Sequence, residues 1–195
     1  MITTELIKEL RDKTGVSIMQ CKKALESVGG DMAKALVVLQ KKGSEVTSKK
    51  SDRKIGAGLI STYVHTDGTV AAMVEVVCET DFVARNQEFK DFAYNVAMQV
   101  VAMNPTFLTM GEITEADKKT ASEVFEEEVK NKPAELREKI LEGKLHSYFK
   151  DKVLLEQSFI KNPDSTIRNL VESATQKFGE KIEITRFTRF SVMGR

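Results

Sequence analysis

The 195-residue sequence has no tryptophan, only three prolines, two histidines and two cysteines. Cys21 and Cys78 lie in apolar periodic segments and belong to no CxxC motif or Cys/His cluster, so we expect buried, reduced thiols rather than a zinc site or a disulfide. His65 and His146 lie outside any HExxH motif, and isolated histidines are more often structural than catalytic. This scarcity argues against redox chemistry and metal-dependent hydrolysis.

Long apolar runs are also missing. No stretch approaches the roughly 20 consecutive apolar residues that a membrane helix needs. Residues 1–5 lead into an acidic, amphipathic segment rather than the apolar core of a signal peptide. We therefore expect a cytoplasmic protein that makes no membrane contact.

The motifs that bind nucleotides or carry nucleophiles are missing too. The sequence has no Walker motif, no GxSxG elbow and no SxxK motif, and Gly56 and Gly58 lack the third glycine of a dinucleotide fingerprint. An enzyme with a site between sheet and helices would need convergent titratable groups, and the sequence offers no recognisable set. We expect no cofactor and no direct nucleotide binding, and we predict a binding protein rather than an enzyme.

Charge is abundant and unevenly distributed. Residues 1–54 contain twelve Lys or Arg and seven Asp or Glu, a net charge of +5, and the remainder carries a net charge of −4. A solvated surface, attraction to an acidic protein and nucleic-acid binding all remain open for this basic segment. In the last case, phosphates would bind a cluster formed by Lys49, Lys50, Arg53 and Lys54.

Residues 1–42 predict a compact module of three helices, because apolar residues recur there at intervals of three and four. Ser17 and Asp31 are suited to cap the second and third helices. The expected helix ends are Thr14-Gly15, Gly29-Gly30 and Gly43. We expect the second helix to face the core with the side chains of Ile18, Met19, Ala24, Leu25 and Val28.

Residues 43–58 are polar, basic and punctuated by glycine, which is typical of a linker and compatible with some helix in it. We place the domain boundary inside this segment. The chain is thus divided into residues 1–54, a three-helix domain with its linker, and residues 55–195, an α+β core domain.

In the second part the period changes to two. Residues 59–64 and 70–78 predict an antiparallel hairpin around Asp67-Gly68, with the second strand inside a sheet that helices cover. We expect a helix at 86–103, followed by a helical hairpin from 114 to 141 that breaks at 131–133. A short helix at 143–150 and a final helix capped by Asp164 or Ser165 should follow. The chain is expected to end in a terminal strand at 182–192. The fold class is α+β.

The most unusual local sequence, residues 78–86, lies between an apolar strand and a long helix, where functional loops concentrate. Two interpretations remain open. In the structural one, Thr80 or Asp81 caps the helix and Phe82 packs against it as a hydrophobic staple. In the functional one, Phe82 is an exposed wedge beside the Asp81 carboxylate.

The segment Glu79-Thr80-Asp81-Phe82-Val83-Ala84-Arg85-Asn86 resembles the TDFVA signature segment of the elongation factor Ts family. The first three helices are similar to the ubiquitin-associated-like domain with which that family opens. The resemblance spans the chain and is carried also by Leu10–Val16, Met19–Leu25, Glu138–Leu145 and Arg186–Phe190.

The resemblance implies a guanine-nucleotide exchange factor of translation elongation, which binds the GTPase elongation factor Tu with GDP. The N-terminal module would dock on the GTPase domain, and the segment formed by Thr80, Asp81, Phe82 and Val83 would intrude near the nucleotide. Phe82 would insert between side chains of the partner, while Asp81 would help to displace Mg²⁺. GDP would then leave and GTP could bind, and any contact with nucleic acid would be indirect.

The chain differs from the longer family members in two respects. Those members carry two similar core subdomains, and this chain has room for one. Resemblance to the short form implies a homodimer whose second copy supplies the missing surface, with the terminal strand as the interface. Longer relatives also place a histidine in the helix after the corresponding loop of their second subdomain, where this chain has Asn95 and Gln99.

Overall fold

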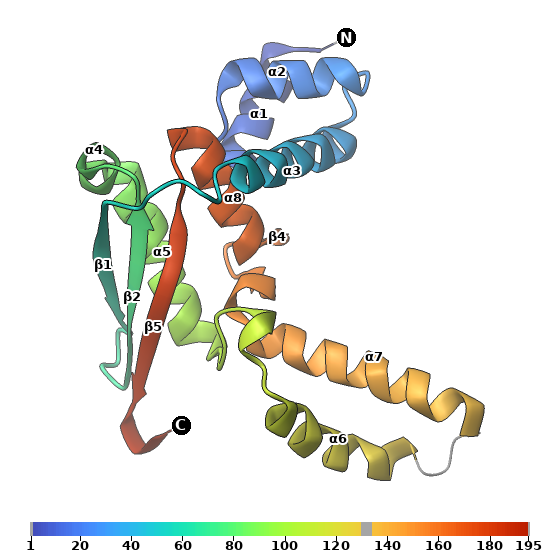
Figure 1. Cartoon of the computed structure of the whole chain (residues 1–195). Coiled ribbons are helices and arrows are strands. Elements are labelled where there is room, and N and C mark those ends of the chain that lie inside the picture. The colour runs from blue at the N-terminus through green and yellow to red at the C-terminus, as the bar shows by residue number, and fades with distance from the viewer. Residues whose placement is uncertain (1, 130–133, 195) are drawn as a thin grey trace.

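The computed structural model describes residues 2–129 and 134–194. It combines an N-terminal helical head, a three-stranded sheet with helices on one face, and a projecting helical hairpin (Figure 1). The predicted α+β class is confirmed. Within the described part of the chain, no helix has the length and apolar character needed to cross a membrane.

The head consists of α1 (Thr4–Thr14), α2 (Ile18–Ser27) and α3 (Met32–Lys49). The predicted caps are confirmed: the Ser17 hydroxyl accepts from the N–H of Gln20 at 3.4 Å, and the Asp31 carboxylate accepts from the N–H of Lys34 at 3.0 Å. The head has a hydrophobic core of its own, formed by Leu10, Val16, Cys21, Ala24, Leu25, Ala35 and Leu39.

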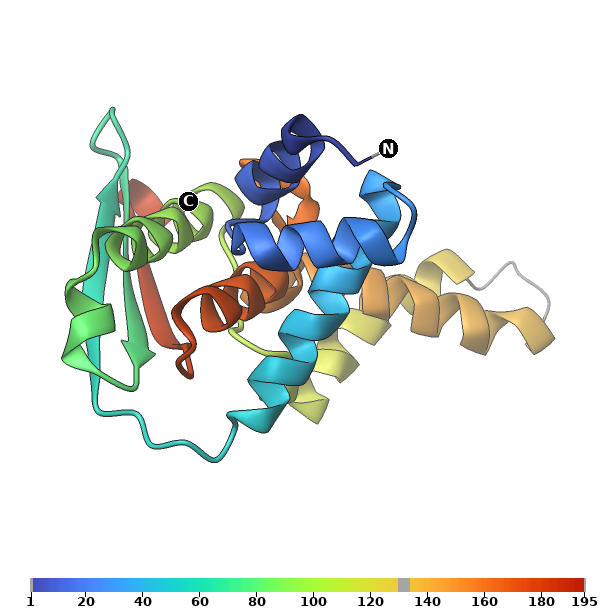
Figure 2. The same ribbon diagram turned by 90° about the horizontal axis from the view of Figure 1, so that it is seen from above.

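The predicted end of the third helix is wrong, because α3 continues through Gly43 to Lys49. Gly43 is buried where α3 crosses α8 (Ile167–Phe178), and this crossing joins the head to the core (Figure 2). The glycine therefore permits a close approach of two helices instead of ending one. Residues 50–56 form the connection to the sheet.

The sheet contains β1 (Ala57–Val64), β2 (Val70–Cys78) and β5 (Glu183–Ser191) in the antiparallel order β1-β2-β5. This order confirms that the second strand is interior. One face of the sheet packs against α5 (Gln87–Met103), and the shared core includes Val74, Val76, Phe89, Val96 and Ile184.

The expectation that helices cover the sheet holds for one face only. On the opposite face, which we call the open face, the side chains of Ile60, Met73 and Phe190 are exposed. The same face carries the ion pair of Glu75 with Arg186, whose Oε2 and Nε atoms lie 2.9 Å apart. The alternation along the strands determines which residues share a face but not whether a helix packs on it.

The hairpin consists of α6 (Glu115–Val129) and α7 (Ala134–Lys152), and the predicted break at 131–133 lies outside the described residues. The separate short helix expected at 143–150 is wrong, because α7 runs through Gly143 without interruption. One exposed glycine costs a helix only about 1 kcal/mol. Contacts with α6 stabilise α7 near Gly143. Lys144 forms an ion pair with Glu128 at 2.5 Å, and the ring of Tyr148 packs against the ring of Phe125.

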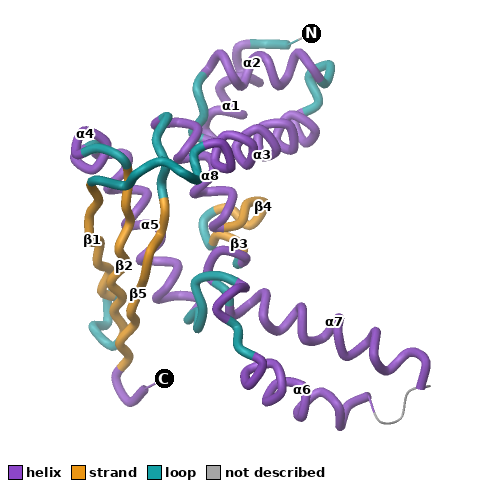
Figure 3. Tube along the Cα trace, in the orientation of Figure 1, coloured by secondary structure: helices purple, strands orange, loops and turns teal. Residues whose placement is uncertain are grey.

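The connections between α5 and α6 and between α7 and α8 hold elements that the sequence did not predict (Figure 3). These are the short turns η1 (Met110–Glu112) and η2 (Leu154–Glu156) and the two-stranded ribbon of β3 (Ser158–Phe159) and β4 (Asn162–Thr166). The predicted cap of the last helix, Asp164 or Ser165, is wrong, because Thr166 caps α8. The Thr166 hydroxyl accepts a hydrogen bond from the N–H of Asn169, and the Asn169 side chain accepts one from the N–H of Thr166. After β5 the chain forms the turn η3 (Val192–Gly194).

Candidate functional site

The candidate segment Thr80–Val83 lies where β2 ends at one end of the sheet (Figure 1). Thr80 has an extended backbone, and the next residues form the short helix α4 (Asp81–Arg85). Asn86 separates α4 from α5 and caps α5 by accepting from the N–H of Glu88 at 2.8 Å. The segment thus stands between the interior strand and the long helix, as predicted.

Phe82 and Val83 point in different directions. The side chain of Val83 is 9% exposed and belongs to the core, whereas that of Phe82 is 85% exposed. Successive helical residues are rotated by about 100°, so burying Val83 turns its neighbour outward. The staple interpretation is therefore wrong, because Phe82 does not pack against α5.

The polar residues of the segment are also accessible. The Asp81 carboxylate lies 3.0 Å from the Arg85 guanidinium, and both side chains are largely exposed. Thr80 occupies the cap position of α4, but its hydroxyl makes no capping hydrogen bond. That hydroxyl donates instead to a carboxylate from a distant part of the chain.

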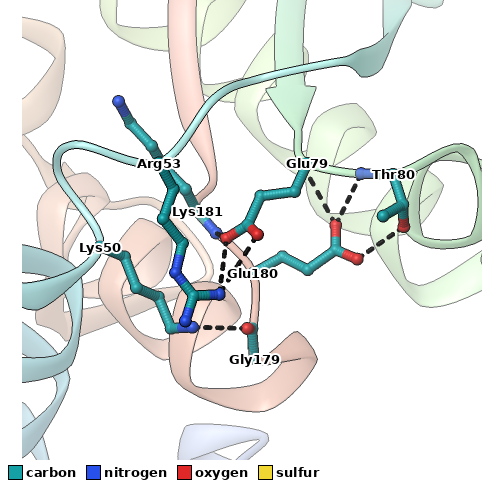
Figure 4. A network of polar contacts seen from close by, with 7 residues as sticks. All are labelled: Lys50, Arg53, Glu79, Thr80, Gly179, Glu180 and Lys181. Atoms are coloured by element: carbon teal, nitrogen blue, oxygen red, sulfur yellow. Dashed lines mark hydrogen bonds and ion pairs between the residues drawn. The ribbon is translucent and has the colours of Figure 1, made fainter.

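This carboxylate belongs to Glu180, in the turn between α8 and β5. It accepts hydrogen bonds from the N–H of Glu79 at 3.1 Å, from the N–H of Thr80 at 3.0 Å and from the Thr80 hydroxyl at 2.6 Å (Figure 4). A single carboxylate therefore holds the backbone immediately before Asp81.

Glu79 makes the reverse connection. Its carboxylate accepts from the N–H of Lys181 at 2.6 Å and pairs with Arg53 of the linker at 3.2 Å. These hydrogen bonds hold the pKa of Glu79 below its ordinary value, the Lys181 N–H contributing most and Arg53 less. Two bonds of 2.6 Å tie the linker to the same turn, from Lys50 Nζ to the Gly179 carbonyl and from Lys181 Nζ to the Ser51 carbonyl.

Sequence reasoning missed this network, which we call the clasp and define as Arg53, Glu79, Thr80, Glu180 and Lys181. Glu79 and Glu180 are 101 positions apart, and Glu180 lies outside the segment that the sequence singled out. They meet because β2 and β5 are antiparallel neighbours, which brings the end of one beside the start of the other. Pairing of the interior strand with the terminal strand was the signal that could have revealed it.

The head carries three exposed apolar side chains, Ile18 and Met19 in the first turn of α2 and Val37 of α3. The prediction that Ile18 and Met19 lie in the core is therefore wrong. The helix is covered by α1 and α3 further along, at Cys21, Ala24 and Leu25. Periodicity identifies a stripe on a helix, but not where along it the neighbouring helices end.

Asn95 and Gln99 of α5 make structural contacts. Gln99 is buried, and its amide nitrogen donates to the Gln157 side chain and to the Ser158 carbonyl, each at 3.1 Å. Asn95 accepts from Lys161 at 2.8 Å. Both side chains link α5 to the region of β3 and β4.

The cysteines are buried and free, as predicted. Burial raises the pKa of both thiols, which keeps them protonated and unreactive.

A cleft of about 560 Å³ lies between head and core, and charged residues from both parts line it. Across its edge Lys177 of α8 pairs with Glu88 of α5 at 2.7 Å. Lys13 of α1 pairs with Glu9 at 2.9 Å. The carboxylates of Glu88 and Glu9 thus neutralise both lysines. We interpret the cleft, which residues of both parts line, as the junction of head and core.

Comparison with known proteins agrees with the signature at this site. Residues 7–194 match the family model described as elongation factor TS. Three similar proteins are each named elongation factor Ts. The one from Thermodesulfovibrio yellowstonii is 44% identical over 192 residues, 98% of this chain and 96% of the relative. The one from Carboxydothermus hydrogenoformans is 42% identical over 194 residues, which cover 98% of this chain and 89% of the relative. The one from Thermotoga petrophila is 42% identical over 191 residues, which cover 98% of this chain and 96% of the relative. The match covers the head, the sheet and the hairpin alike, and the chain belongs to the elongation factor Ts family.

Proposed function

We propose that this chain is a guanine-nucleotide exchange factor that binds elongation factor Tu with GDP, displaces Mg²⁺ and promotes GDP release so that GTP can bind. Family membership over almost the full length supports the partner and the cytoplasmic setting of translation elongation. The observation that carries the proposal is Phe82, whose ring is 85% exposed on a helix anchored by the buried Val83.

The ring is suited to act as a wedge. A folded protein gains nothing from exposing phenylalanine, whereas burying the ring in a partner is favourable by about 1.5 to 3 kcal/mol. Anchored by Val83, the ring would enter the partner at a fixed angle and displace its side chains. An exchange factor is expected to displace side chains of its partner near the bound nucleotide in this way.

Asp81 would act beside the wedge, at the Mg²⁺ of the partner. The ion neutralises phosphate charge in the nucleotide site, so loss of the ion weakens the binding of GDP. An exposed carboxylate next to the inserted ring would disturb the groups that hold the ion. Thr80 and Val83 would complete the partner-binding segment, Val83 as its anchor.

Exchange of this kind needs no catalytic residue in the chain. The factor and GDP weaken each other's binding to elongation factor Tu by the same factor, because the coupling between two ligands is reciprocal. GTP then expels the factor, and the overall equilibrium is unchanged. We therefore place this chain among binding proteins rather than enzymes.

The head would supply a second contact with the GTPase domain. Its exposed Ile18, Met19 and Val37 offer apolar side chains for docking, and its net positive charge favours an acidic surface. Docking through the head would leave nucleic acid without a direct role.

We further propose that the chain forms a homodimer through its open face. Ile60, Met73 and Phe190 form an apolar surface there, and a shallow groove of about 280 Å³ runs beside the pair of Glu75 with Arg186. Stacking of two such faces about a two-fold axis would bury the apolar side chains of both copies. The second copy would supply the surface that longer relatives carry in one chain.

The exchange function is tested by following release of a fluorescent GDP analogue from purified elongation factor Tu, with this protein at sub-stoichiometric concentration. Acceleration over multiple turnovers is the expected result. If release stays slow although both proteins are folded, the proposal fails. Salt-dependent binding to RNA would then favour the nucleic-acid alternative for the basic head.

A further inference from the structure

We propose that Glu180 is a positioning residue that fixes the Thr80–Val83 segment in the orientation needed to drive Phe82 into the partner. The inference rests on the exchange function proposed above. It assigns a role to a residue that lies outside the signature segment and about 100 positions from it.

Phe82 cannot fix its own position. With 85% of its surface exposed, the ring has little packing to hold it, so the backbone on either side must determine where it points. After the ring, Val83 is inserted into the hydrophobic core. Before the ring, the corresponding anchor is the hydrogen-bonded backbone of Glu79 and Thr80.

Glu180 provides that earlier anchor. Its Oε2 atom accepts from both backbone N–H groups and its Oε1 atom accepts from the Thr80 hydroxyl, so the carboxylate holds three donors within 3.1 Å (Figure 4). Hydrogen bonds to a charged acceptor are stronger than neutral ones. The segment is thereby held at both ends, with Asp81 and Phe82 as the projecting residues.

The clasp is closed by a second, reciprocal set of bonds. Glu79 accepts from the N–H of Lys181, the residue that follows Glu180, so each carboxylate holds the backbone of the other strand end. Arg53 adds the linker to this arrangement through Glu79. The position of the wedge is therefore tied to the connection between head and core, and docking of the head would present the wedge in a defined place.

Preorganisation determines what Glu180 does for exchange. A segment already held in its bound shape does not lose conformational freedom when it inserts, so more of the binding energy is available to distort the partner. Losing the charged hydrogen bonds should slow GDP release in the factor-saturated complex by about tenfold to a hundredfold. A residue that only stabilised the fold would leave this maximal rate unchanged for folded protein.

The test compares Glu180→Ala with Phe82→Ala, with the double variant, and with Glu156→Ala. Glu156 is a matched control, because it is partly buried like Glu180 and its carboxylate likewise accepts a hydrogen bond, from the Arg168 guanidinium at the other end of α8. Two quantities are measured: the maximal rate of GDP release at saturating factor, and the NMR order parameters of residues 80–83 in the free protein.

We expect Glu180→Ala to lower both quantities, Glu156→Ala to change neither, and the double variant to be no slower than Phe82→Ala alone. Glu180→Gln, whose amide oxygen can still accept from both N–H groups, should recover most of the rate.

The inference is overturned by unchanged order parameters in Glu180→Ala, or by effects of the two single variants that multiply. If the unaltered protein does not accelerate release, the exchange function itself fails and the role of Glu180 in it fails too. Normal acceleration by Glu180→Ala overturns the positioning role alone.

Discussion

Gly43 of α3 lies so close to Glu172 of α8 that a Cβ atom at position 43 would stand 3.3 Å from the Cβ atom of Glu172. This is tighter than the usual contact between side-chain carbons, and the backbone of α8 lies 3.6 Å away. The head is therefore joined to the core at a point where even a Cβ atom would require Glu172 to shift.

Gly43→Leu should lower the free energy of unfolding by about 1 to 3 kcal/mol, because a bulky side chain forces α3 and α8 apart. The opposite sign is expected for Gly143→Ala in α7, where an added Cβ atom meets nothing within 4 Å. There the gain in helix propensity should stabilise by about 0.8 to 1 kcal/mol. Urea unfolding of both variants measures the difference. If Gly43→Leu leaves the protein as stable as the parent, the helices do not cross so closely in solution.

Glu172→Gln should stabilise the protein at neutral pH and not at acidic pH. Burial raises the pKa of Glu172 above its ordinary value, so the folded state binds the proton more tightly than the unfolded state. The associated stability is fully present below the unfolded pKa and is lost as the pH rises through the folded pKa. Glutamine does not titrate, and its advantage should grow over that interval. Urea unfolding at several pH values tests this, and a constant difference would contradict it.

Phe82→Ala should reduce the rate of GDP release by about tenfold to a hundredfold, the equivalent of the 1.5 to 3 kcal/mol gained by burying the ring. The free energy of unfolding should change by less than about 0.5 kcal/mol, because the ring is exposed. Release of a fluorescent GDP analogue and urea unfolding give the two values. Val83→Ala is the informative comparison, since it removes core packing and should destabilise. Severe unfolding of the Phe82 variant would contradict the assignment of the ring as a wedge.

Much of the fold could be predicted because the signals were local. Ser17 and Asp31 cap their helices, and Asp67-Gly68 joins two strands, since each of these features depends on neighbouring residues. Gly43 shows where local reasoning ends. A glycine at such a position can end a helix or permit a close crossing, and only the presence of α8 decides between these outcomes.

The candidate site divides in the same way. Thr80, Asp81, Phe82 and Val83 were proposed from their contiguous motif, but the outward direction of Phe82 depends on Val83 reaching the core. Glu180 could not be found, because its relation to Thr80 exists only after the terminal strand pairs with the interior one.

Phe190→Glu should convert the proposed homodimer to a monomer. Its ring is 67% exposed on the open face, where Phe190 pairs with Ala71 of β2, and a charge placed there would be buried when two faces stack. Val124→Glu is the matched control, because Val124 is 62% exposed but lies on α6, away from the sheet. Sedimentation analysis of both variants and the unaltered chain gives the oligomeric state. A dimer that persists in the Phe190 variant, or that is lost in the Val124 variant, would move the interface from the open face to another surface. If the unaltered chain sediments as a monomer, the proposed homodimer is wrong, and no second copy supplies the missing surface in the free protein.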